Sequence, residues 1–286
     1  MQSICHPGMR VLCLHGGGGS AKVMRYQTAA LQAALPSATF EFLEGERIWP
    51  DHLRSPVLTR MFGEGPYYGW YQVDDDGVGT RTTAEKLQDP SVKFTYTGAP
   101  EAVAHVQSAI EKRGPFDALL AFSQGAIVTT LLTAMSLRPG ATPPSWRHNI
   151  LVCGMPPRDE RYMREFFLPP APPLDFPCTL VHGRQDEFYE YGKRLDAIYP
   201  NATVFEHPDG HKFPGSKELT ASIAAHLLAA LSETPAEAPA LSAERIATLR
   251  AESFADDVPV PDGAEGWSDA QLRSYFESGG AERPMV

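Results

Sequence analysis

The segment ALLAFSQGA, at residues 118–126, constrains the fold of this chain more than any other part of the sequence. Its first five residues are apolar without polar alternation, which predicts a strand buried on both faces of a parallel sheet. A helix is expected to begin at Gln124, so only Ser123 separates the strand from the helix. This context is that of a nucleophile elbow, a tight and strained turn that exposes a serine hydroxyl. Taken alone, Ser123 is equally well explained as the N-cap of that helix.

The same alternation of strand and helix extends over residues 10–232. Further apolar strands are predicted at 11–14, 39–43, 149–153, 178–181 and 203–206. Apolar residues at helical spacing predict helices from Ser20 to Leu35 and over 101–110, 124–135 and 219–231. Strands that alternate with helices predict an α/β fold with a mainly parallel sheet and helices on both faces.

Two long stretches, 47–100 and 155–177, interrupt this alternation. Connections of such length are usually functional segments or disordered ones. Both stretches are rich in aromatic residues, most clearly in FGEGPYYGWY at residues 62–71. This composition favours lid insertions or pocket walls over disorder.

The composition changes after Ser232, which predicts one complete α/β domain over residues 1–232 and an acidic extension over 233–286. The extension has 11 acidic and 4 basic residues, whereas residues 1–232 have 24 and 21. Most of the net charge of −10 therefore belongs to the extension. Short helices are expected at 243–254 and 269–276, and docking of the extension on the core in cis or on a partner chain both remain open.

The charge and the cysteines exclude several classes of function. A net charge of −10 argues against nucleic-acid binding and against a polybasic membrane surface, because both need a basic face. No stretch approaches the roughly 20 apolar residues of a membrane span, and the apolar run near the N-terminus is too short for a signal peptide. The four cysteines form no C-x-x-C pair, so we expect reduced thiols, no metal site and a cytoplasmic location.

Two further residues complete a candidate catalytic set with Ser123. Asp186 follows the strand at 178–181, and His211 lies in the loop between the last strand and the last helix. The order Ser, Asp, His along the chain is that of α/β-hydrolases, and all three residues follow the carboxyl ends of predicted strands. Each one alone could be a cap, turn or surface residue. Their joint position indicates a nucleophile, an orienting carboxylate and a general base.

The glycine run 16–19, directly after the first strand, predicts part of an oxyanion hole. Acyl transfer passes through a tetrahedral oxyanion that needs two fixed N–H donors. One donor is expected from the backbone of Gln124, and the other from Gly17, with Gly18 as the second choice. No Gly-Lys-Ser/Thr follows the run, which excludes a phosphate loop.

Five segments in this order give the chain a resemblance to a known family. They are LCLHGGGGSAKVMRYQTAAL, FGEGPYYGWY, LLAFSQGA, LVHGRQDEF and HPDGHKFP. The sequence resembles the fungal serine hydrolase (FSH) family of α/β-hydrolases over roughly residues 10–230. The resemblance implies Ser123 as nucleophile, His211 as general base and acid, and Asp186 as the carboxylate that orients His211, without a cofactor. The family usually has glycine where this chain has Ala121.

Family members are carboxylesterases, and some are stand-alone thioesterases that release a polyketide from an acyl carrier. The resemblance therefore implies an acyl ester or thioester substrate and, as a partner, the acyl carrier protein of a polyketide synthase. Two alternatives remain open: an acyltransferase that uses the same triad, and an inactive hydrolase fold that serves as a scaffold. Candidate substrate-pocket residues are His15, Phe62, Tyr67, Tyr68 and Trp70. The aromatic members of this set could equally form a hydrophobic cluster beneath a long loop.

Overall fold

The computed structural model describes residues 8–232, 258–260 and 275. The chain divides into two units, Met1–Leu231 and Ser232–Val286. The helices predicted at 243–254 and 269–276 fall outside the described residues, apart from Tyr275. Among the described residues, no helix is both long and apolar enough to cross a membrane.

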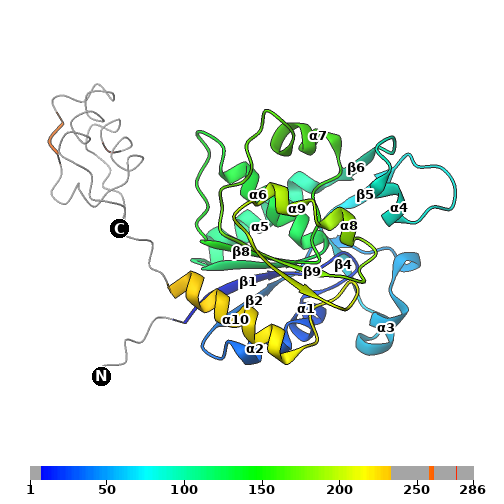
Figure 1. The fold of residues 1–286 in the computed structure, drawn as a ribbon, viewed down its shortest axis with the longest axis horizontal. Helices are drawn as coiled ribbons and strands as arrows, with labels where there is room; N and C mark the ends of the chain where they lie inside the picture. Colours follow the sequence, from blue (N-terminus) through cyan, green and yellow to red (C-terminus); the bar gives the residue numbers. More distant parts are fainter. Residues whose placement is uncertain (1–7, 233–257, 261–274, 276–286) are drawn as a thin grey trace. The chain divides into compact units, whose positions relative to one another are not determined.

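A six-stranded parallel sheet forms the centre of the first unit (Figure 1). Its strand order is β10-β9-β8-β7-β1-β2, and every neighbouring pair is parallel. The strands are β1 (Arg10–Leu14), β2 (Thr39–Leu43), β7 (Ala118–Phe122), β8 (His148–Val152), β9 (Cys178–Gly183) and β10 (Thr203–His207). All six predicted strands are confirmed, with ends that differ by one or two residues.

Helices cover both faces of the sheet, as predicted (Figure 1). One face carries α1 (Ala21–Gln27), α2 (Ala29–Ala34) and α10 (Lys217–Ser232), and the other carries α5 (Ala99–Arg113), α6 (Gln124–Ser136), α8 (Tyr189–Gly192) and α9 (Leu195–Ile198). Side chains of β1 alternate between the two hydrophobic clusters. The single helix predicted from Ser20 to Leu35 is wrong, because it divides at Thr28, whose hydroxyl donates to the Met24 carbonyl.

The order of the strands creates a site for chemistry. The chain enters at β1, moves outward to β2, and then returns to β7 on the other side of β1. Loops that leave the carboxyl ends of β1 and β7 therefore diverge, and such switch points are where open α/β sheets bind ligands. The glycine run follows β1 and Ser123 follows β7, so this topology brings both to one edge of the sheet.

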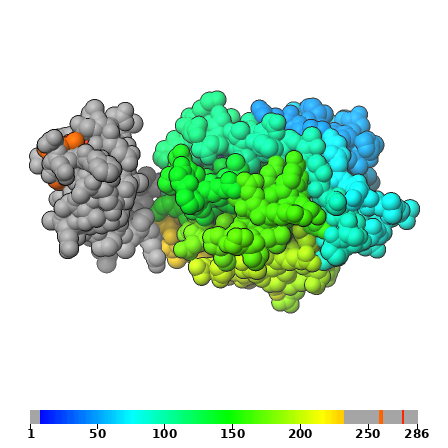
Figure 2. All heavy atoms as spheres, turned by 90° about the horizontal axis from the view of Figure 1, so that it is seen from above, coloured from blue at the N-terminus to red at the C-terminus, as the bar shows by residue number. Residues whose placement is uncertain are grey.

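The first insertion has secondary structure of its own, which the sequence did not reveal. Its elements are β3 (Arg47–Ile48), the 3-10 helix η1 (Asp51–Leu53), α3 (Pro56–Phe62), β4 (Tyr68–Gly69), β5 (Gln72–Asp75), α4 (Thr83–Gln88) and β6 (Phe94–Thr97). β3 pairs with β4 and β5 with β6, both antiparallel. Its cyan residues project at one end of the first unit in Figure 2. Trp70, Tyr71 and Tyr96 are buried and join the cluster that contains α5 and α6.

The second insertion contains α7 (Glu160–Tyr162) and the π-helical turn η2 (Met163–Phe167). Asp159, which is almost fully buried, connects it to the first insertion. Its carboxylate accepts from the Tyr96 N–H at 2.8 Å and pairs with Arg161 at 2.6 Å. Burial would raise the pKa of Asp159, but the hydrogen bonds from Arg161 and the Tyr96 N–H outweigh it and hold that pKa below its usual value.

Replacing Asp159 by alanine is expected to lower the free energy of unfolding by about 1–3 kcal/mol, because the buried Tyr96 N–H loses its acceptor. Urea denaturation measures this change. Asp175→Ala serves as the control, since Asp175 is exposed, and should change the free energy by no more than about 0.5 kcal/mol. Equal stabilities of the two variants would show that Asp159 does not hold the insertions together.

Candidate active site

Ser123 occupies the strained turn that the sequence predicts. Its backbone has φ 51° and ψ −117°, a conformation that non-glycine residues rarely adopt. Gly125 lets the turn approach β1, because a Cβ atom at this position would lie 2.7 Å from the His15 carbonyl oxygen and 2.8 Å from that of Leu14. Ala121 is fully buried in β7 and takes the place of the usual glycine.

The three predicted catalytic residues form one chain of hydrogen bonds. His211 Nε2 lies 2.8 Å from Ser123 Oγ, and His211 Nδ1 lies 2.7 Å from Asp186 Oδ2. The other oxygen of Asp186 accepts from the Phe188 N–H at 2.9 Å. The Phe122 and Phe188 rings flank the imidazole, with centroids 4.9 and 5.2 Å from its own. These contacts fix the imidazole between the serine and the carboxylate.

The electrostatics of Asp186 suit the role of an orienting group. Burial would raise the pKa of this carboxyl, but the hydrogen bond and charge of His211 and the Phe188 N–H outweigh it, so the pKa is lowered. Asp186 is therefore a carboxylate at neutral pH and accepts the proton on His211 Nδ1. In that tautomer His211 Nε2 carries the lone pair that faces the Ser123 hydroxyl.

The predicted oxyanion donors lie beside this set. Within the part of the chain that the structure describes, the backbone N–H groups of Gly17, Gly18 and Gln124 have no hydrogen-bond acceptor. Gly17 is exposed, whereas Gly18 has φ 69°, and an added Cβ there would lie 2.9 Å from Trp49 Nε1. Trp49 also packs against Gly17. Sequence reasoning missed Trp49, because no motif marks it and only its contacts place it here.

The predicted pocket residues are mostly buried. His15 has no exposed surface: Nε2 accepts from the Gly45 N–H, and Nδ1 donates to the Gly16 carbonyl at 2.7 Å. Tyr67 is buried and donates to the Gly63 carbonyl, whereas Tyr68 and Phe62 are half-buried. These contacts support the glycine loop and the insertion.

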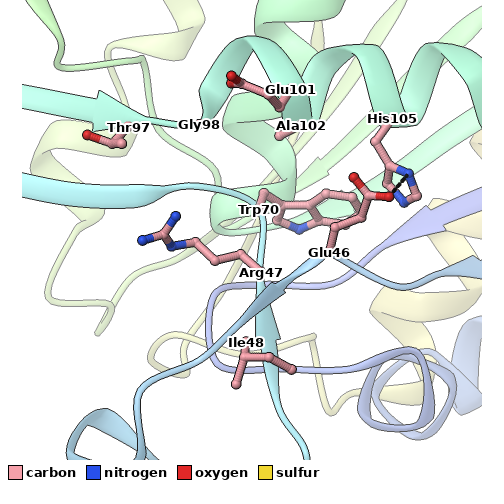
Figure 3. Close-up of a pocket in the computed structure, with 9 residues that line it drawn as sticks. All are labelled: Glu46, Arg47, Ile48, Trp70, Thr97, Gly98, Glu101, Ala102 and His105. Atoms are coloured by element: carbon pink, nitrogen blue, oxygen red, sulfur yellow. Dashed lines mark ion pairs between the residues drawn. The ribbon is translucent and has the colours of Figure 1, made fainter.

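Of these five residues, only Trp70 lines the cavity of about 560 Å³ that is drawn in Figure 3. The residues that line it are Glu46, Arg47, Ile48, Trp70, Thr97, Gly98, Glu101, Ala102 and His105. Glu46 and His105 form an ion pair at 3.2 Å across one side. Ser123 and His211 are not among the lining residues, so this cavity is separate from the hydrogen-bonded set.

A buried thiol lies against the same set. Ligand atoms of Cys153, Asp186 and His211 all lie within 4.8 Å of one another, which is close enough to hold a metal ion. The imidazole and the carboxylate are already hydrogen-bonded to each other. Burial, aided by the charge of Asp186, raises the pKa of Cys153 to about 12, so the thiol is protonated at neutral pH.

Comparison with known proteins identifies the family to which this chain belongs. The profile described as "Serine hydrolase (FSH1)" matches residues 5–223. The chain belongs to the FSH1 serine hydrolase family. The family resemblance predicted from the five segments is thereby confirmed, and the enzyme is a serine hydrolase of the esterase class.

Two relatives of this FSH1-family enzyme are named as esterases, and one solved structure shares its fold. It is 31% identical over 216 residues to "Esterase mlcF" of Penicillium citrinum. The matched segment covers 73% of this chain and 84% of that protein. It is 30% identical over 216 residues to "Esterase OVCA2" of Homo sapiens, covering 73% and 90%. A carboxylesterase from Mesorhizobium loti shares the fold, with a TM-score of 0.50, 20% identity, and coverage of 77% and 88%.

Proposed function

We propose that this FSH1-family enzyme hydrolyses acyl esters and thioesters through an acyl-enzyme on Ser123. The observation that carries the proposal is the continuous hydrogen-bond chain from Asp186 through His211 to Ser123. His211 Nε2 accepts the serine proton as Oγ attacks the substrate carbonyl carbon, and Asp186 stabilises the imidazolium that forms. The strained backbone of Ser123 presents its hydroxyl at the start of α6, where the N–H dipoles favour negative charge.

The unpaired N–H groups of Gly17 and Gln124 receive the oxyanion of the tetrahedral intermediate. Collapse of this intermediate transfers the His211 proton to the leaving alkoxide or thiolate and leaves the acyl group on Ser123. Water, deprotonated by His211, then attacks the ester carbonyl. Collapse of the second intermediate breaks the bond between the acyl carbon and Ser123 Oγ, Oγ takes the proton back from His211, and the acid is released. Apart from the substrate and this water molecule, the steps use only the side chains and N–H donors named above.

We further propose that the natural substrate is an uncharged acyl chain held as a thioester on a carrier, as in polyketide release. Residues 1–232 have a net charge of only −3, which suits an uncharged acyl group. The similarity to proteins named as esterases, such as mlcF, supports an acyl substrate. Transfer of the acyl group to an acceptor other than water is the competing outcome.

A panel of matched esters and thioesters tests this proposal. For one acyl group, we expect kcat/KM for the N-acetylcysteamine thioester to equal or exceed that for the p-nitrophenyl ester, with an optimum at a particular chain length. Release of the free acid, measured with and without an added alcohol acceptor, separates hydrolysis from acyl transfer. Hydrolysis of esters alone would reject the thioester proposal, and failure to react with a fluorophosphonate probe would favour a scaffold.

A further inference from the structure

The side chain of Gln124 makes contacts that its expected backbone role does not require. Gln124 begins α6 directly after Ser123, and only 8% of its surface is exposed. Its Oε1 accepts from the Trp70 N–H at 2.8 Å, and its Nε2 donates to the Tyr71 carbonyl at 2.9 Å. The carboxamide therefore binds backbone groups of two consecutive residues of the first insertion, more than 50 residues away along the chain.

Trp70 extends this connection to the glycine loop. Its indole Nε1 donates to the His15 carbonyl at 2.7 Å, and its ring centroid lies 5.1 Å from that of the His15 imidazole. In Figure 3 the Trp70 ring also borders the cavity near Ala102 and His105 of α5. Trp70 is thus hydrogen-bonded both to the residue after the nucleophile and to the residue before the glycines.

The packing around the carboxamide is equally close. A Cβ atom on Gly17 would lie 3.3 Å from Gln124 Oε1, and one on Gly69 would lie 3.1 Å from it. The ring of Trp49 covers both glycines: a Cβ atom on Gly17 would lie 3.0 Å from the ring, and one on Gly69 would lie 2.8 Å from it. The amide group therefore fills the space between the glycine loop and the β3–β4 hairpin.

We propose that the Gln124 side chain is a positioning residue that sets the spacing of the oxyanion hole. This inference rests on the proposed function, in which Gly17 and Gln124 donate the two N–H groups. Through Trp70, the carboxamide ties the loop that carries one donor to the helix start that carries the other. A shift of about 1 Å between such groups can cost on the order of 100-fold in rate.

The test replaces Gln124 by methionine, which keeps the length of the side chain, adds no charge and cannot form either hydrogen bond. We expect kcat for a p-nitrophenyl ester to fall roughly 10–100-fold, with KM changed by less than about threefold. The rate of fluorophosphonate labelling should fall in parallel, because that reaction uses the same oxyanion hole. The midpoint of the pH–rate profile should stay unchanged, because the contacts of His211 are intact.

Two further variants decide between interpretations. Gln107→Met makes the same exchange on the surface of α5 and should retain wild-type kcat. Trp70→Phe removes the indole N–H to His15 together with part of the buried ring, and should also lower kcat by about 5–10-fold. This variant tests the proposal by itself if Gln124→Met does not fold. Wild-type kcat in folded Gln124→Met or Trp70→Phe, or a rise confined to KM, would overturn the proposal. An unmodified enzyme that neither cleaves esters nor reacts with the probe would instead refute the proposed function.

Discussion

Replacing Ser123 by alanine is expected to lower kcat/KM for an ester by roughly 10⁴–10⁶-fold and to abolish fluorophosphonate labelling. The reason is that Oγ, which lies 2.8 Å from His211 Nε2, is the atom that we propose forms the acyl-enzyme. The fold should survive, because alanine and serine have the same backbone restrictions at φ 51°. Ester hydrolysis, probe labelling and the thermal unfolding midpoint are measured on the same preparation.

The matched control for this change is Ser222→Ala. Ser222 lies on the exposed side of α10, where its hydroxyl donates to the Glu218 carbonyl, so its loss should leave activity within about twofold. A folded Ser123→Ala variant that still turned over the ester at the wild-type rate would remove Ser123 from the reaction. Another residue would then have to be the nucleophile.

Asp186→Asn is expected to lower kcat by roughly 10³–10⁴-fold. An asparagine amide can donate to His211 Nδ1, which favours the tautomer whose Nε2 carries the proton and cannot accept one from Ser123. The change also removes the negative charge that stabilises the imidazolium. Steady-state kinetics over a pH series measures the loss, and probe labelling should slow to a similar extent.

A second Asp–His pair in the same domain provides the control for Asp186. Asp196 accepts from the buried His182 at 3.1 Å and pairs with Lys193. Asp196→Asn should keep kcat within about threefold, although it can lower stability. Equal losses in the two variants would mean that the carboxylates act through the fold and not through His211.

The parts of the fold that the sequence predicts are those encoded locally. Each strand of the central sheet is a short, nearly continuous apolar run, because a parallel sheet is buried on both faces. Ser123, Asp186 and His211 could be placed because each follows one of these strands, and parallel strands end at one edge. Their mutual distances, by contrast, come from the three-dimensional structure.

The strands of the first insertion could not be predicted from the sequence, for physical reasons. β3 and β4 have two residues each, and all four residues of β5 are exposed, so none carries an apolar period. Their pairing is fixed by distant contacts instead, above all those of Gln124 with the segment after β4. The stacking of Trp49 on Gly17 is likewise invisible in a linear pattern.

Because β10 lies at the border of the sheet, esterase activity is expected to depend on whether this last strand is paired. Among the strands that the structure describes, β10 pairs only with β9, and His211 follows it in the chain. Border strands have one partner and open more readily than interior ones. A molecule in which β10 has detached can keep Ser123 in its turn and most of its core, yet His211, the base that we propose, is no longer beside Ser123. Only molecules in which β10 is paired with β9 are therefore expected to hydrolyse esters. Mild denaturant should abolish ester hydrolysis at a lower concentration than it reduces the helical content of the protein.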